Sequence, residues 1–199
     1  MVGVVAEPAA KALEAAGISF TWAAMPSARQ METIKKGDAA ACGLGWFKRP
    51  DREEFALFSA PIYHDRRMVI VARLNDPRFL GDPNIEDLFK MKDLRLLTKT
   101  GYSYGAVMDE KIAANKPTRD ETSTDNFHML DMVALDRADF MLISAEEADY
   151  LLSQKRETAS QLATFPFADA PDGEARYLMC TKMVPQDLLD RFNKALTAQ

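Results

Sequence analysis

The alternation of strand-like and helix-like segments constrains the fold of this chain more than any other feature. Met68–Ala72 (MVIVA) is an apolar run typical of a buried strand. A small-residue turn at Gly101–Gly105 precedes a helical pattern that runs to about Asn115. Phe140–Ile143 is another apolar strand, and the helix after it runs to about Leu152. This order predicts an α/β fold with largely parallel sheets and helices on both faces.

The start of the chain continues the pattern. Pro8–Ala16 predicts a helix, and the glycine that follows it is typical of a helix end. Ile18–Trp22 alternates apolar and polar residues, which is the period of a strand. Ala39–Leu44 predicts a short apolar strand, and residues 45–58 predict a loop with a turn.

The carboxyl ends of the predicted strands locate the candidate site. Ligands of open α/β sheets bind beyond these ends. We therefore expect functional residues in the loops that follow Leu44, Thr98 and Ile143.

Composition excludes several classes of protein. The 199 residues allow one large domain or two small ones. The net charge of −5 argues against a nucleic-acid binder, which would present a basic face. No run of ~18 apolar residues could span a membrane, and Met1 leads into a helix-like stretch with no visible signal peptide.

The two cysteines, Cys42 and Cys180, lie in apolar strand-like runs. These positions favour buried free thiols. A disulfide stays open, because it needs the two Cα atoms within ~7 Å of each other. CxxC and histidine-rich patterns are absent from the sequence, so neither a metal nor a cofactor is expected.

The stretch from Gly45 to Tyr63 (GWFKRPDREEFALFSAPIY) resembles the signature of the family 3 extracellular solute-binding proteins, the periplasmic binding proteins for polar amino acids and related solutes. In that family a Gly and a Thr precede a Glu-Arg pair, and Phe-Ser follows six residues after the Arg. Here Asp51-Arg52 and Phe58-Ser59 stand at the matching spacing.

The resemblance covers nearly the whole chain in order. Its further segments match a helix end, the turn of a second lobe, a Gly-Arg-Ala-Asp strand and a closing helix of the family; in this chain they are Ile34–Asp38, Lys99–Ser103, Asp136–Leu142 and Arg191–Leu196. The resemblance implies the type II periplasmic-binding-protein fold, in which two lobes close on a hinge.

The implied lobe 1 comprises residues 1–66 and 173–199, and lobe 2 comprises residues 67–172. The hinge is expected near Tyr63–Arg67 and Ala168–Gly173. Relative to the family pattern, roughly 25 to 40 upstream residues are absent, including a signal peptide and the usual first strand of lobe 1. A lobe without that strand would expose a sheet edge, which predicts a homodimer that covers it.

Arg52 is the first candidate for ligand binding, because the matching Arg of the family grips a ligand carboxylate. A guanidinium suits this role, since its planar fork pairs with both carboxylate oxygens. The alternative is a solvated Arg paired with Asp51 or Glu53. Gly45 would allow the backbone to approach the ligand closely.

Trp46 and Phe47 follow this glycine. Phe47 stands where the family usually has Thr, so a hydroxyl is replaced by an aromatic ring. Both rings could stack on a planar or apolar ligand, or pack under the loop.

In the second lobe, Lys99, Tyr102 and Ser103 are candidates around the turn that opens a helix. Backbone N–H groups at a helix start favour an anion, although an ordinary helix cap also explains Ser103. Ser144 stands where many amino-acid binders of the family have an Asp for the α-ammonium group. Its structural alternative is a capping box with Glu147.

Together these residues predict a receptor that binds a small carboxylate or amino-acid-like ligand and docks to the permease of an ABC-type uptake system in the periplasm. The replacements at Phe47 and Ser144 predict a ligand that differs from the usual polar amino acids. A periplasmic dehydratase-like enzyme would need an acid or base, for which Glu146, Glu147 and Lys99 are the candidates. A sensory domain is the third possibility; no catalytic motif is present, which favours the receptor.

Overall fold

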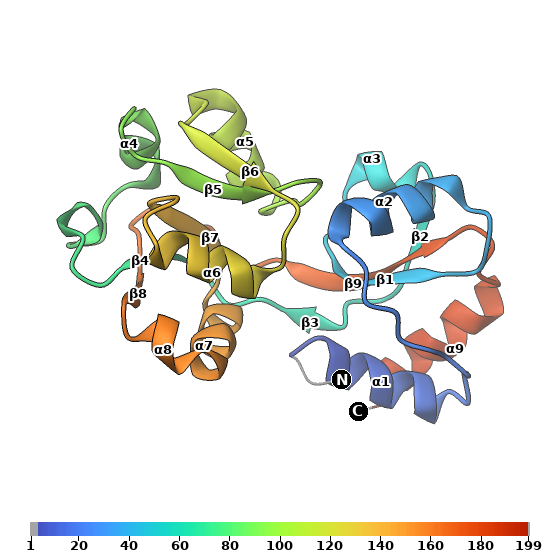
Figure 1. Ribbon diagram of the computed structural model, residues 1–199. Helices are drawn as coiled ribbons and strands as arrows, with labels where there is room; N and C mark the ends of the chain where they lie inside the picture. The colour runs from blue at the N-terminus through green and yellow to red at the C-terminus, as the bar shows by residue number, and fades with distance from the viewer. Residues whose placement is uncertain (1–3, 199) are drawn as a thin grey trace. The chain divides into compact units, whose positions relative to one another are not determined.

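The computed structural model describes residues 4–198, and the chain divides into two units (Figure 1). Unit 1 contains the residues up to His64 and those from Glu174 onward, and unit 2 is Asp65–Gly173. The helices and strands of unit 1 are α1 (Ala6–Ala15), α2 (Ser27–Lys36), β1 (Cys42–Trp46), α3 (Pro50–Glu53), β2 (Ala56–Phe58), β3 (Tyr63–His64), β9 (Ala175–Thr181) and α9 (Gln186–Leu196).

The elements of unit 2 follow one another without interruption. They are β4 (Met68–Arg73), the 3₁₀ helix η1 (Pro77–Phe79), α4 (Ile85–Lys90), β5 (Leu96–Lys99), α5 (Ala106–Asn115), β6 (Arg119–Thr122), α6 (Asn126–Ala134), β7 (Phe140–Ser144), α7 (Ala145–Gln154), α8 (Arg156–Ala159) and β8 (Leu162–Phe165).

The sheet of unit 1 is built around β9, which pairs antiparallel with β1, β2 and β3. The prediction of a largely parallel sheet is therefore wrong for this unit. The sheet is antiparallel because of the chain's topology. After the whole of unit 2, β9 returns to unit 1 and enters between β1 and β2, which run in the opposite direction.

Side chains of β9 alternate between the two faces of this sheet. Leu178 and Cys180 pack with α1 and α9 on one face, and Met179 packs with α2 on the other. Each helix buries its small or apolar face; Ala9 of α1 and Phe192 of α9 are fully buried. This pattern explains why the terminal helices lie together although they are far apart in the sequence (Figure 1).

The predicted strand at residues 18–22 is wrong, because this segment has no strand pairing in the structure. Ile18 is buried and Phe20 packs against the same core, whereas Trp22 contacts Phe20 edge to face at 5.3 Å. The alternation that predicted a strand thus reflects an extended segment that packs on helices without a ladder.

The cysteines form a disulfide, so the prediction of free thiols is wrong. Cys42 of β1 and Cys180 of β9 are direct partners in the antiparallel register, with their Cα atoms 4.0 Å apart. This register places the two sulfur atoms on the same face, within the ~7 Å that a disulfide requires. The bond joins positions 138 residues apart in the sequence.

The sheet of unit 2 has the strand order β6-β5-β7-β4-β8. The pairs β5–β6 and β5–β7 are parallel, whereas β4 runs antiparallel to both β7 and β8. The predicted parallel arrangement therefore holds only for β5, β6 and β7. Consequently Lys99 and Ser144, the last residues of β5 and β7, lie at the same end of the sheet.

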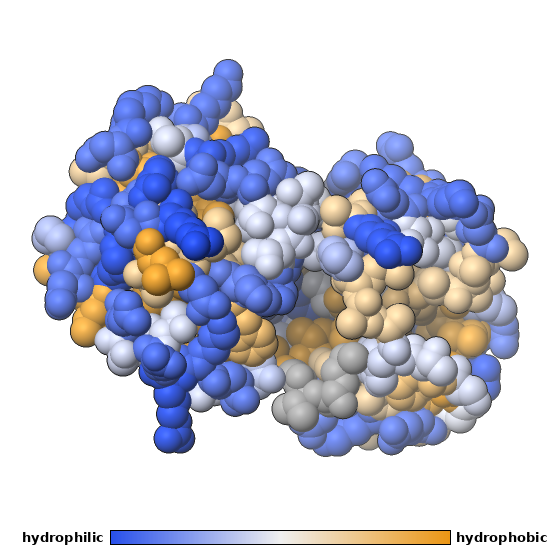
Figure 2. All heavy atoms as spheres, viewed as in Figure 1, coloured by the Kyte–Doolittle hydropathy of each residue, from blue (hydrophilic) through white to orange (hydrophobic). Residues whose placement is uncertain are grey.

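Both faces of this sheet are buried. Ile70, Leu96 and Phe140 belong to a cluster with α4 and α5, whereas Leu97 and Met141 belong to a cluster with α6 and α7. Continuous apolar strands with helices on both sides follow from this double burial. In Figure 2, hydrophilic residues cover most of the visible face of unit 2, with small apolar patches between them.

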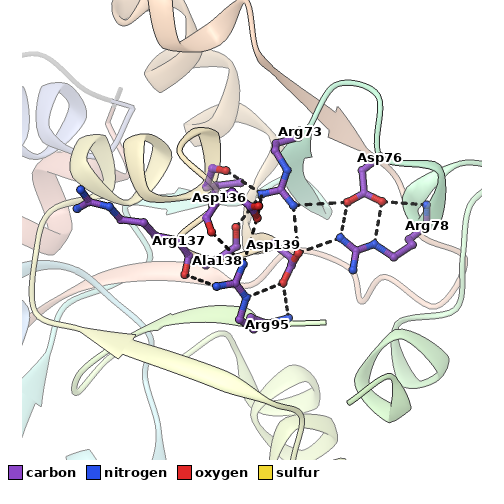
Figure 3. A network of polar contacts seen from close by, with 9 residues as sticks. Arg73, Asp76, Arg78, Arg95, Asp136, Arg137, Ala138 and Asp139 are labelled. Carbon is purple, nitrogen blue, oxygen red and sulfur yellow. Dashed lines mark hydrogen bonds and ion pairs between the residues drawn. The ribbon is translucent and has the colours of Figure 1, made fainter. Parts of the chain in front are cut away.

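A charged network ties β4, β5 and β7 together at the end of the sheet opposite to Lys99 (Figure 3). Its centre is the buried carboxylate of Asp139, which pairs with Arg73 at 3.0 Å, Arg78 at 2.9 Å and Arg95 at 3.0 Å. Burial alone would raise the pKa of Asp139, but the backbone N–H of Arg95 and the guanidinium donors lower this pKa to about 2.

The two chain segments that bound unit 2 pass closely at Gly173. A Cβ atom placed there would lie 1.8 Å from the carbonyl oxygen of Asp65, so only glycine allows this approach. Within residues 4–198, no helix combines the length and apolar character needed to cross a membrane.

Candidate functional site

The candidate site of unit 1 is built on the end of β1. Gly45 has a φ of +79°, in the left-handed region, and the pairing with β9 shifts register between Leu44 and Trp46. Because glycine adopts this conformation without strain, the bulge shifts the register so that Trp46 pairs with Tyr177, and the strand ends before Phe47. Trp46 and Phe47 are both buried, at 7% and 5% exposure.

Trp46 is held from several sides. Its Nε1 donates to Oε1 of Gln30 at 3.1 Å, and its ring lies so close to Gly43 that a Cβ there would be 2.4 Å from Nε1. The guanidinium of Arg52 stacks on the other side, 5.0 Å from the ring centroid. Trp46 therefore packs under the loop and supports Arg52.

Arg52 lies in the short helix α3, which opens with Pro50 at its first turn. Its side chain is 5% exposed, and Nη1 donates to the carbonyl oxygen of Phe47 at 3.0 Å. This burial excludes the alternative of a solvated surface arginine. A buried, preorganised guanidinium that rests on a ring and a carbonyl is a suitable anchor for an anion; ligand contact stays a prediction.

Arg176, which the sequence analysis missed, is a second buried arginine on the same loop. It is the second residue of β9, is 7% exposed, and donates from Nη1 to the carbonyl oxygen of Gly45 at 3.1 Å. Its guanidinium lies 4.0 Å from the centroid of the Phe47 ring. No motif marks this residue; only the register of β9 against β1 brings it to the loop.

In unit 2 the candidate residues gather beyond β5 and β7. Nζ of Lys99 donates to Oδ1 of Asn126 at 3.2 Å, and Nδ2 of Asn126 donates to Oε1 of Glu147 at 2.6 Å. Burial lowers the pKa of Lys99, while the charges of Glu147 and Asp125 act in the opposite direction. The Tyr102 ring centroid lies 6.0 Å from Nζ.

The two residues at the start of α6, Asp125 and Asn126, have different roles. Asp125 is the N-cap, with its carboxylate accepting from the backbone N–H of His128. Asn126 instead bridges Lys99 and Glu147. The start of α6 therefore contributes a polar side chain to the candidate site.

The turn before α5 is internally bonded. Ser103 donates from Oγ to Asp109 at 2.5 Å, and the backbone N–H of Tyr104 donates to the same carboxyl group at 2.8 Å. The Tyr104 hydroxyl accepts from the backbone N–H of Lys99, and burial raises the pKa of this phenol. The Asp109 carboxylate thus accepts from the Ser103 hydroxyl and from one backbone N–H group of this turn, and ligand binding at Ser103 stays a prediction.

Ser144 is the N-cap of α7, as expected, but the predicted capping box is wrong, because its side chain makes no capping bond. The side chain is buried at the end of β7. Glu146, in the first turn, accepts from the backbone N–H of Arg66 through both oxygens, at 3.0 and 3.1 Å. Both oxygens of its carboxylate are therefore already hydrogen-bonded to the segment at the start of unit 2.

A separate cavity of about 690 Å³ lies at the opposite end of the unit 2 sheet, where Arg73 and Arg78 line it. Both guanidiniums are paired with Asp76 and Asp139 in the network of Figure 3. None of the residues predicted to bind ligand lines this cavity.

No protein-family model and no curated protein sequence matches the chain. Solved structures do. An amino acid ABC transporter substrate-binding protein, AbpA from Streptococcus pneumoniae, bound to L-arginine, matches with a TM-score of 0.75 at 15% identity over 99% of this chain and 77% of that chain. Holo ArgBP from T. maritima matches with a TM-score of 0.74 at 16% identity over 99% and 80%.

An ancestral arginine-binding protein bound to glutamine matches with a TM-score of 0.73 at 14% identity, over 96% of this chain and 79% of that chain. These likenesses confirm the predicted fold class: the chain has the α/β fold of substrate-binding proteins. At such low identity they establish the fold alone.

Proposed function

We propose that this protein is the solute-binding receptor of an ABC-type uptake system, and that it binds a small carboxylate or amino-acid-like ligand. The observation that carries the proposal is Arg52, a buried guanidinium fixed on the loop after β1 in a chain with the fold of substrate-binding proteins. The main partner besides the ligand would be the membrane permease.

The disulfide supports a periplasmic location. Disulfides persist in oxidising compartments, and Cys42 and Cys180 form one within the sheet of unit 1. Receptors of this kind meet their ligand outside the cytoplasmic membrane, so the bond and the proposed role agree. The lobes of the receptor are the two units, with movement at residues 63–67 and 168–173.

The predicted homodimer stays a prediction. It is tested by measuring the molar mass in solution, where a monomer at all concentrations would refute it.

The enzyme alternative has less support from the geometry. Of its three candidates, Glu146 is bonded to the backbone of Arg66, and the Asn126 amide lies between Lys99 and Glu147. Turnover of prephenate-like cyclic carboxylates by the purified protein would favour the enzyme over the receptor.

The deciding experiment is a thermal-shift screen with amino acids, other small carboxylates and aromatic acids. A ligand that binds only the folded state stabilises it by ~2.7 kcal/mol at a hundredfold excess over Kd. For a chain of this size this corresponds to roughly 5–10 °C in Tm. We expect Arg52→Ala to abolish the shift.

A matched control is Lys48→Ala, which removes an exposed cation of the same loop that pairs only with Glu53 in the described contacts. This control should keep the full ligand-induced shift. A shift that survives in Arg52→Ala would refute the assignment of Arg52 as the carboxylate anchor, and no shift with any compound would refute the receptor.

A further inference from the structure

The cavity at the Arg73 end of the unit 2 sheet lies within one unit and is built from three chain segments. Its volume of about 690 Å³ falls in the range of small-molecule sites. Its walls are the turn after β4 (residues 73–78), the end of α6 at Ala134, and residues 160–161 before β8. All three belong to unit 2, so the cavity is complete within that unit.

Hydrogen bonds hold these walls together. The backbone N–H of Leu74 donates to the carbonyl oxygen of Gln161 at 2.9 Å, which joins the turn to the segment before β8. Nη1 of Arg73 donates to the carbonyl oxygen of Val133 at 3.0 Å, which joins the turn to the end of α6. The cavity is therefore formed before any ligand arrives, as is usual for binding sites.

Arg78 lines this cavity with unused hydrogen-bond donors. Its Nε and Nη2 donate to the Asp76 carboxylate at 2.9 and 2.6 Å, and Nη2 also donates to Asp139 at 2.9 Å. The inner side of the guanidinium lies 5.9 Å from the centroid of the buried Phe79 ring. Nη1 makes no hydrogen bond within the described chain, and Figure 3 shows it as the terminal nitrogen without a dashed line. Two N–H groups of a fixed guanidinium are thus available.

The charges around Arg78 leave room for an anion. Three guanidiniums share two buried carboxylates; the five residues are Arg73, Arg78, Arg95, Asp76 and Asp139. A third carboxylate, Asp136, pairs with Arg73 and Arg95, but its side chain is 68% exposed and contributes little through water. The guanidiniums therefore outnumber the carboxylates that are withdrawn from water, and a bound anion would balance the excess.

The remaining wall of the cavity is largely apolar. Leu74, Pro77 and Ala134 line it, and Leu74 is 50% exposed. An apolar group bound here would remove this side chain from water, which a fully hydrophilic anion would not do. A cation would be repelled by Arg73 and Arg78. The lining therefore suits a molecule with one acidic group and an apolar part.

We propose that this cavity is a second binding site of the protein, and that it takes a small monocarboxylic acid with an apolar body. The carboxylate accepts from Nη1 of Arg78, and the body lies against Leu74. Because the cavity belongs to unit 2 alone, this inference does not depend on the proposed receptor function.

The test is a titration of the ¹⁵N-labelled full chain, followed by the NMR shifts of its backbone amides, with benzoate, benzamide and acetate at fixed ionic strength. Benzamide lacks the charge of benzoate, and acetate lacks its apolar body. We expect saturable shifts at residues 73–76 and 160–161. Since both the charged hydrogen bond and the apolar contact contribute, benzoate should bind about tenfold more tightly than either of the other probes.

Two variants and a matched control locate the contact. Arg78→Lys keeps a cation beside Asp76 and Asp139 but has no Nη1, so it should reduce benzoate affinity to the level of benzamide. Leu74→Glu puts a second carboxylate beside the ligand and should weaken benzoate at least about tenfold. Leu80→Glu is the control, because Leu80 is a leucine of the same unit that is 64% exposed and does not line the cavity. It should bind benzoate as the unmodified chain does.

The outcomes separate this site from the proposed receptor site. Equal affinity for benzoate and benzamide, an absence of shifts at residues 73–76 and 160–161, or undiminished binding by Leu74→Glu would each overturn the inference. If Arg78→Lys does not fold, Leu74→Glu and the three probes still decide. Arg52→Ala should keep the shifts at the cavity, so failure of the receptor proposal leaves this site standing, and the reverse also holds.

Discussion

Removing the disulfide should cost unit 1 a large part of its stability. The bond closes a loop of 138 residues in the unfolded chain, for which the chain-entropy relation gives about 5 kcal/mol at 25 °C. If unit 2 stays folded while unit 1 unfolds, Asp65 and Gly173 remain in contact, and the effective loop is only about 30 residues. The same relation then gives about 4 kcal/mol.

The tryptophans provide the assay. Trp22 and Trp46 are the two tryptophans of the chain, and both belong to unit 1, so their fluorescence during urea unfolding reports on this unit. We expect the double variant Cys42→Ala/Cys180→Ala to lose about 2–5 kcal/mol of unfolding free energy. The reduced unmodified protein should match the variant, and a thiol reductant should not change the variant.

A loss below about 1 kcal/mol would refute the reasoning, because it would mean that the strand pairing of β1 and β9 does not depend on the bond. The same variant has a functional consequence. Cys42 lies three residues before Gly45, and β1 continues into the loop that holds Arg52. Ligand affinity should therefore fall together with stability.

Three further predictions concern single side chains. Gly173→Ala places a Cβ 1.8 Å from the carbonyl oxygen of Asp65, and should destabilise unit 2 by about 1–3 kcal/mol in a calorimetric melt. Asp139→Asn should cost about 2 kcal/mol or more at pH 7, measured by urea unfolding. Because the folded pKa of Asp139 is lowered to about 2, its contribution is present above pH ~4 and lost toward pH 2, so the difference between variant and unmodified protein should shrink there. Gly43→Ala should displace Trp46, whose Nε1 would lie 2.4 Å from the new Cβ, and shift its fluorescence; an unchanged spectrum would contradict this packing.

In unit 2, the strands with two buried faces could be predicted from the sequence, whereas the edge strands could not. Met68–Arg73 and Phe140–Ser144 stand out because every residue is apolar or nearly so, as double burial requires. Arg119–Thr122 was not predicted, because it is a polar edge strand with exposed side chains. Leu162–Phe165 is also an edge strand and is only four residues long.

Features that depend on the pairing register of the strands could not be predicted from local sequence patterns. The disulfide and Arg176 both follow from the pairing of β9 with β1, two strands that unit 2 separates in the sequence. Neither has a local signal, because each cysteine stands alone in an apolar run and Arg176 has no motif around it. Arg52 was found because a motif surrounds it, and Lys99 because it precedes a recognisable turn.

The two replacements that distinguish this chain from the family it resembles have different consequences in the structure. Where the resembled family has a hydroxyl, this chain has Phe47, and the ring carries Arg176 against its face at 4.0 Å. Where the family has an Asp, this chain has a buried Ser144, and Lys99 is the charged group beyond the neighbouring strand. The change at position 144 removes a carboxylate from the end of β7, whereas the change at position 47 leaves the charge of the loop unaltered and gives Arg176 a ring to pack against. A ligand selected by these changes therefore need not carry an α-ammonium group.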